Sequence, residues 1–193
     1  MVKTQSTMIA LGTKIPYFRL PDVVSGNIVS SDDLPDKKAI LAMFICNHCP
    51  YVKHVQEEIV KIGKDYVDKS LSIVAISSND IEQYPDDAPG NLKKQAQNLG
   101  FNFPYLFDET QSVAKAFTAA CTPDFFLFNE KRELAYRGQL DDSRPGNDAP
   151  VNGKDLREAI DLVLVGKRVS EQQKPSAGCN VKWKVGNEPL YFV

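Results

Sequence analysis

Two cysteines, Cys46 and Cys49, stand three positions apart, where an apolar run gives way to an amphipathic one. A thiolate is a nucleophile toward disulfides and peroxides, and a second thiol about one helical turn away can close a disulfide with it. We therefore expect a redox-active dithiol of two catalytic cysteines, in which Cys46 attacks and Cys49 resolves.

The residues between and after the two cysteines are expected to support the thiolate. A helix beginning here would direct its unpaired N–H groups and the positive end of its dipole toward Cys46, and would so lower the pKa of that thiol. Pro50 suits a first helical turn, where no N–H is needed. Asn47 and His48 fill the turn. A protonated His48 would stabilise the thiolate and make the couple more oxidising; the alternative is a solvated loop histidine.

A zinc site is the main alternative for a close cysteine pair. Zinc prefers four ligands, often supplied as two close pairs. The other two cysteines, Cys121 and Cys179, are single, and the histidines are His48 and His54. We therefore expect no metal. The sequence also has no phosphate-cradling glycine loop, so we expect no nucleotide, and exchange through the two thiols needs no bound cofactor.

The segments around the dithiol predict a strand, a helix and a second strand. Residues 39–45 are continuously apolar, as in a strand buried on both faces. Apolar residues then recur at spacings of three and four over 52–66, which indicates an amphipathic helix. Residues 71–77 form a second apolar run. The dithiol therefore lies at the strand-to-helix junction of a βαβ unit, whose crossover should be right-handed.

The rest of the chain predicts a mixed sheet. A hairpin-like lead-in over 12–34 precedes the βαβ unit. The expected later elements are a loop and a helix within 86–100, an extended piece over 103–107 and a helix over 110–120. A strand hairpin over 124–128 and 134–138, a polar loop over 141–153 and a helix marked by 156, 160 and 163 follow. A parallel half followed by an antiparallel hairpin favours an α/β fold with a central mixed sheet flanked by helices.

Length and composition favour one domain over 1–193, with a core at about 12–166 and a C-terminal tail over 167–193 that lacks periodicity. We expect the tail aromatics Trp183, Tyr191 and Phe192, with Leu190, to dock on the body or on another subunit, which leaves a homodimer open.

The charge balance and the N-terminus bear on partners and compartment. The formal net charge is −2, and without a basic excess we expect no nucleic-acid or membrane partner. No apolar run approaches the ~18 residues of a membrane span. The first residues lack the apolar stretch of a signal peptide, so we expect a cytoplasmic, reducing location.

A second landmark is Thr122-Pro123, which precedes the apolar run 124–128. Together with the dithiol, it resembles the thioredoxin superfamily, in which a cis-proline before the third core strand faces the active-site cysteines. The resemblance implies a thioredoxin-like fold with a cis peptide at Pro123. It also implies that the backbone of Thr122 pairs with bound substrate.

The lead-in 12–22 resembles the alkyl hydroperoxide reductase/thiol-specific antioxidant branch, which includes peroxiredoxins. With 141–146 and 178–184, the whole chain is similar to a peroxiredoxin-like group that carries a C-x-x-C motif. This resemblance implies a disulfide or peroxide substrate. It further implies regeneration by a cellular thiol reductant such as thioredoxin or glutathione.

The chain departs from both relatives. Peroxiredoxins carry a threonine three residues before the peroxidatic cysteine, where this chain has Met43 or, counted from Cys49, Cys46. They also use an arginine, and the nearest here is Arg137. Thioredoxins carry a buried aspartate six residues before the first cysteine, where this chain has Ile40. These departures favour a thiol-disulfide oxidoreductase. The alternatives are a thiol peroxidase with an antioxidant role, and a non-catalytic redox sensor or binding module.

Five further residues have two interpretations each. Cys121, two residues before Pro123, could be an additional redox partner or a buried small hydrophobe. Cys179 could have a regulatory or resolving role or be an inert tail thiol. Asp141, Asp142 and Arg144 could border the active site or belong to a salt-bridged polar loop.

Overall fold

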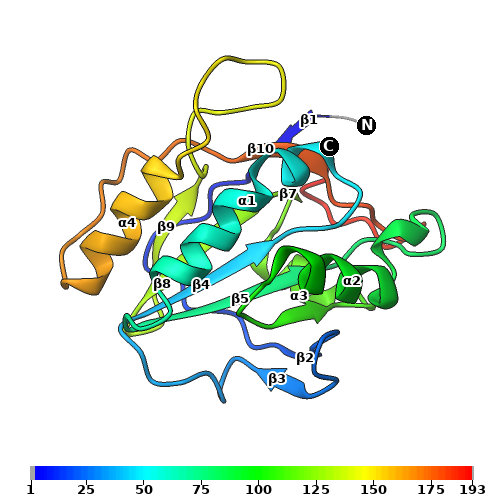
Figure 1. Cartoon of the computed structure of the whole chain (residues 1–193), viewed down its shortest axis with the longest axis horizontal. Helices are drawn as coiled ribbons and strands as arrows, with labels where there is room; N and C mark the ends of the chain where they lie inside the picture. The colour runs from blue at the N-terminus through cyan, green and yellow to red at the C-terminus, as the bar shows by residue number, and fades with distance from the viewer. Residues whose placement is uncertain (1–2, 193) are drawn as a thin grey trace.

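The computed structural model describes residues 3–192 and is built around one mixed sheet. The strands β4 (Ala39–Phe44), β5 (Leu71–Ser77) and β6 (Tyr105–Phe107) are parallel, and β8 (Asp124–Asn129) and β9 (Leu134–Gly138) continue the sheet in antiparallel pairing. The sheet order is β6-β5-β4-β8-β9 (Figure 1). The fold is thioredoxin-like, and the predicted α/β class with a mixed sheet is confirmed.

The central strand β4 is buried at all six positions. Successive side chains of a strand point to opposite faces, so Leu41 and Met43 join the core on one face, and Ile40 and Phe44 join the core on the other. A strand covered on both sides has no polar alternation, which explains the continuous apolar run.

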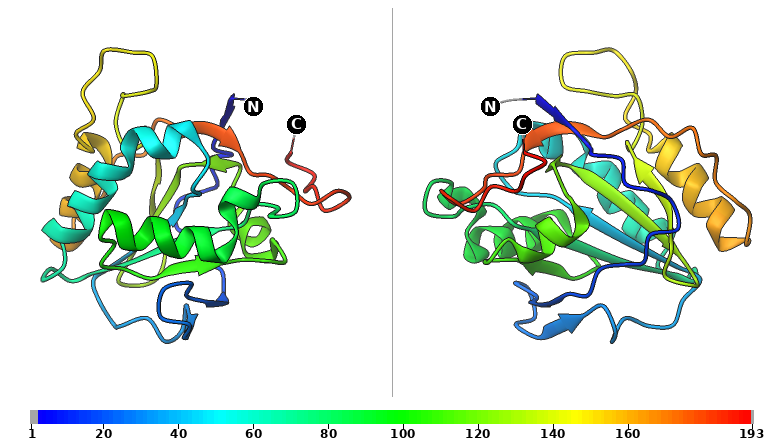
Figure 2. Two further views of the ribbon diagram at one scale, coloured as in Figure 1. Left: turned by 45° about the vertical axis from the view of Figure 1, so that its right-hand side comes forward. Right: turned by 180° about the vertical axis from the view of Figure 1, so that it is seen from behind.

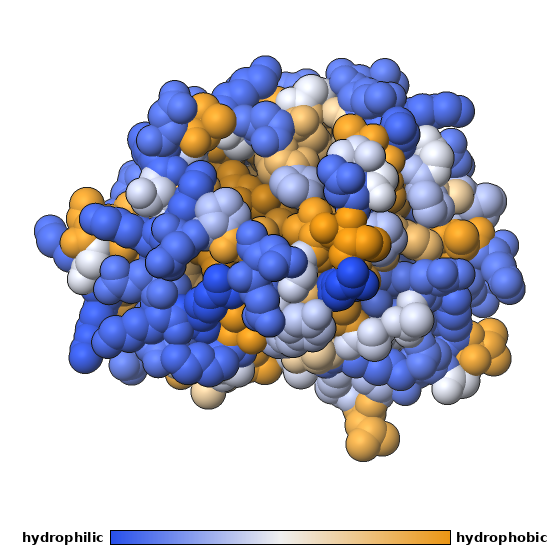
Figure 3. Space-filling model, turned by 90° about the horizontal axis from the view of Figure 1, so that it is seen from below, coloured by the Kyte–Doolittle hydropathy of each residue, from blue (hydrophilic) through white to orange (hydrophobic). Residues whose placement is uncertain are grey.

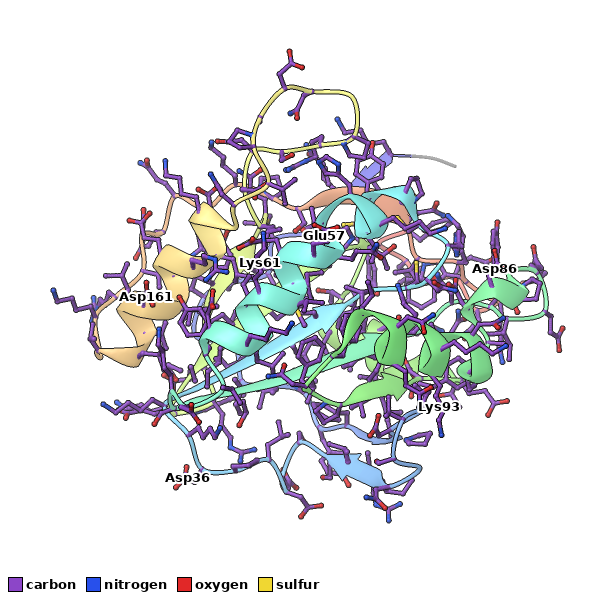
Figure 4. All side chains as sticks on the ribbon, in the orientation of Figure 1. Asp36, Glu57, Lys61, Asp86, Lys93 and Asp161 are labelled. Carbon is purple, nitrogen blue, oxygen red and sulfur yellow. The ribbon has the colours of Figure 1, made fainter. Side chains whose placement is uncertain are left out.

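Helices cover both faces of the sheet (Figures 1 and 2). The helices α1 (Pro50–Asp65), α2 (Pro89–Leu99) and α4 (Lys154–Leu164) pack on the Leu41 face, whereas α3 (Ser112–Phe117) packs on the Phe44 face. On α1, Glu57 and Lys61 are exposed and point away from the sheet (Figure 4). These helices lie where the periodicity predicts them.

The lead-in contains the expected hairpin, formed by β2 (Arg19–Pro21) and β3 (Ile28–Ser30). It lies at the lower side of the molecule in Figure 1, and Figure 3 shows that side, where apolar residues gather among hydrophilic ones. An apolar hollow lined by Leu34, Val67, Leu71 and Phe103 lies between the lead-in and the sheet.

A second, three-stranded sheet joins the two ends of the chain to the middle. It has the order β1-β10-β7, where β1 is Lys3–Gln5, β7 is Cys121–Thr122 and β10 is Ala177–Asn180. A short 3₁₀ helix, η1 (Pro85–Asp87), completes the elements. The strand β10 lies in the C-terminal segment for which no strand was predicted. Its four residues are small or polar and do not form a strand pattern in the sequence.

Among residues 3–192, no helix combines the length and the apolar character that crossing a membrane requires.

Candidate active site

The two cysteines of the motif lie side by side at the carboxyl end of β4. Cys46 follows the strand by two residues, and Cys49 is the N-cap residue of α1, with Pro50 in the first turn as predicted. Both side chains are fully buried, at 0% exposure. The fold therefore places the dithiol at the strand-to-helix junction but closes it off from solvent.

Thr122 contacts both sulfur atoms. Its Oγ1 lies 3.4 Å from Cys46 Sγ, and its carbonyl oxygen lies 3.3 Å from Cys49 Sγ. The bond between Thr122 and Pro123 is cis, as the resemblance implies. Cys49 and Thr122 are 73 positions apart in the sequence but are in contact in the structure. The two landmarks of the sequence thus form one site.

The environment of Cys49 favours its thiolate. A hydrogen bond from the Cys179 thiol is the main cause that lowers the pKa of Cys49, to about 2, and a second hydrogen bond from Cys46 acts in the same direction. The backbone of Val52, in the first turn of α1, adds to the effect. Of the two thiols of the motif, Cys49 therefore has the lower pKa.

The environment of Cys46 has the opposite effect. Burial, the hydrogen bond that Cys46 donates to Cys49, and the nearby negative charge of Asp87 raise the pKa of Cys46 well above that of a free thiol. The predicted lowering of the pKa of Cys46 is therefore wrong. The reason is burial first, together with the neighbouring Cys49 and Asp87, while the N-cap position of α1 is taken by Cys49 and not by Cys46.

The loop between the cysteines is held by Asp87, a residue that the sequence analysis missed. One carboxylate oxygen of this buried side chain accepts the backbone N–H groups of Asn47 (2.8 Å) and His48 (3.0 Å). The other accepts the Asn79 side-chain amide at 2.8 Å. The available signal is topological, since residues after β5 meet residues after β4 at the same edge of parallel strands.

The His48 ring also binds Asp87, through Nδ1, and stacks on Tyr84 at a centroid distance of 5.0 Å. This contradicts the alternative of a solvated loop histidine. Ligand atoms of Cys46, His48 and Asp87 lie within 4.8 Å of one another. These donor types suit zinc, but the Asp87 carboxylate is engaged in ordering the loop, so we assign the group to loop structure.

The C-terminal segment closes the site. Cys179 of β10 pairs with Thr122 of β7 in antiparallel register. A Cβ atom on Gly178 would lie 2.0 Å from the Thr122 carbonyl oxygen, so only glycine allows this approach. The backbone of Thr122, which the resemblance assigns to substrate, is thus already paired with the chain's own strand.

Among residues 3–192, Cys121 and the aromatic side chains of the C-terminal tail form no hydrogen bond with the dithiol. Cys121 is buried and donates to the Pro123 carbonyl oxygen at 3.6 Å, and burial raises the pKa of its thiol. Trp183 docks in the core, whereas Leu190 and Phe192 are exposed and do not dock on the body of this chain.

Arg137 does not serve the dithiol. Its side chain is fully buried, pairs with Asp124 at 3.1 Å and lies over the ring of Phe126 at 4.3 Å. Phe126 belongs to the core on the Phe44 face, and α1 packs on the other face. The arginine that polarises peroxide in peroxiredoxins therefore has no equivalent in Arg137.

The 141–153 loop borders the site on the Pro123 side. Pro123, Tyr51 and Arg144 line a small hollow there. Asp141 instead caps the loop by accepting the backbone N–H of Gly153 at 2.7 Å. The His54 ring, through Nε2, contacts Ser143 Oγ at 2.7 Å.

Fold and site together define a thioredoxin-like protein with an enclosed cysteine pair. The chain belongs to the AhpC/TSA family, whose pattern matches residues 11–137. No match was found among proteins with curated descriptions.

Solved structures give the same fold. An uncharacterised conserved protein from Geobacillus kaustophilus is 55% identical, with a TM-score of 0.93 over 95% of this chain and 97% of its own. A hypothetical protein from Sinorhizobium meliloti 1021 is 48% identical, with a TM-score of 0.93 over 95% and 100%. A thioredoxin-family thiol:disulfide interchange protein from Chlorobium tepidum is 18% identical, with a TM-score of 0.62 over 81% of this chain and 99% of its own. This similarity is one of fold.

Proposed function

We propose that this chain is a thiol-disulfide oxidoreductase that exchanges disulfides through Cys46 and Cys49. The observation that carries the proposal is the contact of both sulfurs with Thr122, beside the cis peptide to Pro123. Membership of the AhpC/TSA family and the oxidoreductase fold support a redox role for these thiols.

The electrostatics favour roles opposite to those expected from the sequence. The Cys49 thiolate attacks one sulfur of a substrate disulfide and expels the other sulfur as a thiolate. Cys46 then gives up its proton to that leaving group or to water and attacks Cys49 Sγ. The second substrate sulfur leaves, the Cys46–Cys49 disulfide remains, and two electrons have passed to the substrate. A cytoplasmic thiol reductant such as thioredoxin or glutathione restores the dithiol.

The closed site favours a small substrate. Thr122 is paired with Cys179, and both catalytic sulfurs have 0% exposure. A protein substrate that adds a strand at Thr122 would first have to displace β10. A low-molecular-weight disulfide needs only a small opening.

A thiol peroxidase is the second candidate, favoured by the lowered pKa of Cys49. In this reaction the Cys49 thiolate attacks the O–O bond, becomes a sulfenic acid and releases water or an alcohol. Cys46 then condenses with it and a water molecule leaves. Two features count against efficient peroxide reduction. Arg137 is paired with Asp124 and not with the dithiol, and the position three residues before Cys49 holds Cys46 instead of a threonine.

The two functions are separated by reacting one pre-reduced preparation with glutathione disulfide, insulin and hydrogen peroxide, so that the Cys46/Cys49 dithiol itself supplies the two electrons. We expect the small disulfide to oxidise the dithiol fastest. Faster oxidation by peroxide, with a sulfenic acid trapped on Cys49 in Cys46→Ser/Cys179→Ser, would instead establish the peroxidase. Activity on none of the three, with a disulfide that is reduced only in the presence of a protein partner, would favour the redox sensor.

The roles within the pair are tested by trapping. Cys46→Ser/Cys179→Ser should retain a mixed disulfide with glutathione on Cys49, because neither neighbouring thiol remains to displace the glutathione. Cys49→Ser is the matched control and should retain little. Accumulation on Cys46 in Cys49→Ser alone would reverse the roles.

A further inference from the structure

Cys179 is a buried thiol that the proposed reaction does not use. It is 2% exposed and lies in the same core cluster as Cys46 and Cys49. Its strand is firmly held, because Val181 N–H donates to the Ala120 carbonyl oxygen at 3.1 Å and Lys182 N–H donates to Asn79 Oδ1 at 2.9 Å. The position of Cys179 in the site is therefore a defined feature of the fold.

The register of β10 brings Cys179 to the reactive sulfur. Cys179 stands opposite Thr122, whose carbonyl oxygen lies 3.3 Å from Cys49 Sγ. Directly opposite residues of an antiparallel pair direct their side chains to the same face, and Thr122 Oγ1 lies 3.4 Å from Cys46 Sγ. Cys179 therefore extends its side chain toward the dithiol, and its hydrogen bond with Cys49 is the first cause of the shifted pKa values of both thiols.

We propose that Cys179 is a third redox thiol of this site and forms a disulfide with Cys49. The inference rests on the proposed dithiol chemistry and deepens it. Starting from the Cys46–Cys49 disulfide, Cys179 Sγ loses its proton and attacks Cys49 Sγ. The Cys49–Cys179 bond forms, the Cys46–Cys49 bond breaks, and Cys46 leaves as a thiolate that takes up the proton. No electrons enter or leave, so the exchange needs no further oxidant.

The exchange would give the site two oxidised states. In one, the disulfide stays within the Cys46–Cys49 loop. In the other, β10 is bonded covalently to the N-terminus of α1, and Cys46 is again a thiol. The second state fastens the C-terminal strand across Thr122, where an added peptide strand would pair.

Cys121 provides a matched control within the chain. It is as buried as Cys179 and is the neighbour of Thr122, but its thiol donates to the Pro123 carbonyl oxygen. Adjacent residues of a strand point to opposite faces, and Thr122 directs its side chain to Cys46. Cys121 is therefore not placed to attack Cys49.

The test is disulfide mapping of Cys46→Ser after oxidation with diamide. Trypsin cleavage separates the cysteines into three peptides, 39–53 with Cys49, 116–131 with Cys121 and 169–182 with Cys179. We expect peptide 39–53 joined to peptide 169–182 in the monomer. The crosslink should be lost in Cys46→Ser/Cys179→Ser and retained in Cys46→Ser/Cys121→Ala.

A folded Cys46→Ser protein that yields a 39–53 to 116–131 crosslink, or only a Cys49–Cys49 dimer, would overturn the proposal. If this variant does not fold, the wild type decides, because limiting oxidant should give both the Cys46–Cys49 and the Cys49–Cys179 disulfides. A wild type that yields only the former refutes the third thiol. Turnover of glutathione disulfide is measured separately, so a crosslink without turnover rejects the proposed function alone, and turnover without a crosslink rejects the role of Cys179 alone.

Discussion

Asp87 holds His48 at two points, accepting the backbone N–H of His48 at 3.0 Å with one carboxylate oxygen and the ring Nδ1 with the other. The same side chain accepts the N–H of Asn47 at 2.8 Å and is 0% exposed. One buried carboxylate thus orders the turn between the two cysteines.

Asp87→Ala should destabilise the protein by about 3 kcal/mol, because it leaves buried N–H groups of the loop without acceptors. Urea unfolding measures the change. Asp86→Ala is the matched control, since this neighbouring side chain is exposed (Figure 4) and Asn47 Nδ2 uses only the backbone oxygen of Asp86. Equal effects of the two substitutions would contradict the role of Asp87.

Asp87 should also make stability depend on acid pH. Burial alone would raise its pKa, but hydrogen bonds from His48 and Asn79 outweigh burial and hold the pKa of Asp87 below 3.8. The folded state therefore favours the ionised carboxylate. This contribution is present above the unfolded value near 3.8 and is lost as the pH falls through the lower folded pKa.

The wild type should consequently lose more unfolding free energy than Asp87→Asn between about pH 5 and about pH 1. Urea titrations of both proteins across this window supply the comparison. Parallel pH profiles for the two proteins would show that Asp87 does not carry the effect.

Gly178→Ala should loosen the closure of the site, because the new Cβ would lie 2.0 Å from the Thr122 carbonyl oxygen. Overpacking of this kind costs roughly 2 kcal/mol. If the cost falls on docking of β10, alkylation of Cys46 and Cys49 by iodoacetamide should accelerate about tenfold or more.

Gly90→Ala in α2 is the control for the glycine substitution, because a Cβ there meets no atom within 4 Å. It should be neutral or slightly stabilising and should leave the alkylation rate unchanged. An unchanged rate in Gly178→Ala as well would show that β10 does not guard the thiols.

Cys46 and Cys49 should differ in the pH dependence of their alkylation. In Cys46→Ala, the rate at Cys49 should stay nearly constant from neutral pH down to pH 5, because the remaining hydrogen bond from Cys179 keeps its pKa low. In Cys49→Ala, the rate at Cys46 should rise only in alkaline solution, because burial raises the pKa of that thiol. The converse pattern would restore Cys46 as the nucleophile.

Adding Cys179→Ala to Cys46→Ala should raise the pKa of Cys49, since the donated hydrogen bond is removed. The ultraviolet absorbance of the thiolate follows this titration. Cys121→Ala in the same background should leave the midpoint in place, and a midpoint that ignores Cys179 would contradict the contact.

The sequence by itself determined the thioredoxin-like fold and the two landmarks of the site. The apolar run 39–45 predicts a buried strand, and the apolar periodicity after Pro50 predicts a helix with one buried face. Both are local patterns that can be recognised in the sequence. The C-x-x-C spacing and Thr122-Pro123 could be recognised because each is contiguous in the chain.

Which cysteine has the lower pKa, and what surrounds the pair, follow from tertiary contacts. The lowered pKa of Cys49 depends first on a donor 130 positions along the chain, and Asp87 reaches the loop from η1. The strand β10 has no periodic signal, and its place beside Thr122 follows from the packing of Gly178. Such contacts join residues distant in sequence, and in a buried site the pKa of a thiol is set by these neighbours and not by its local motif.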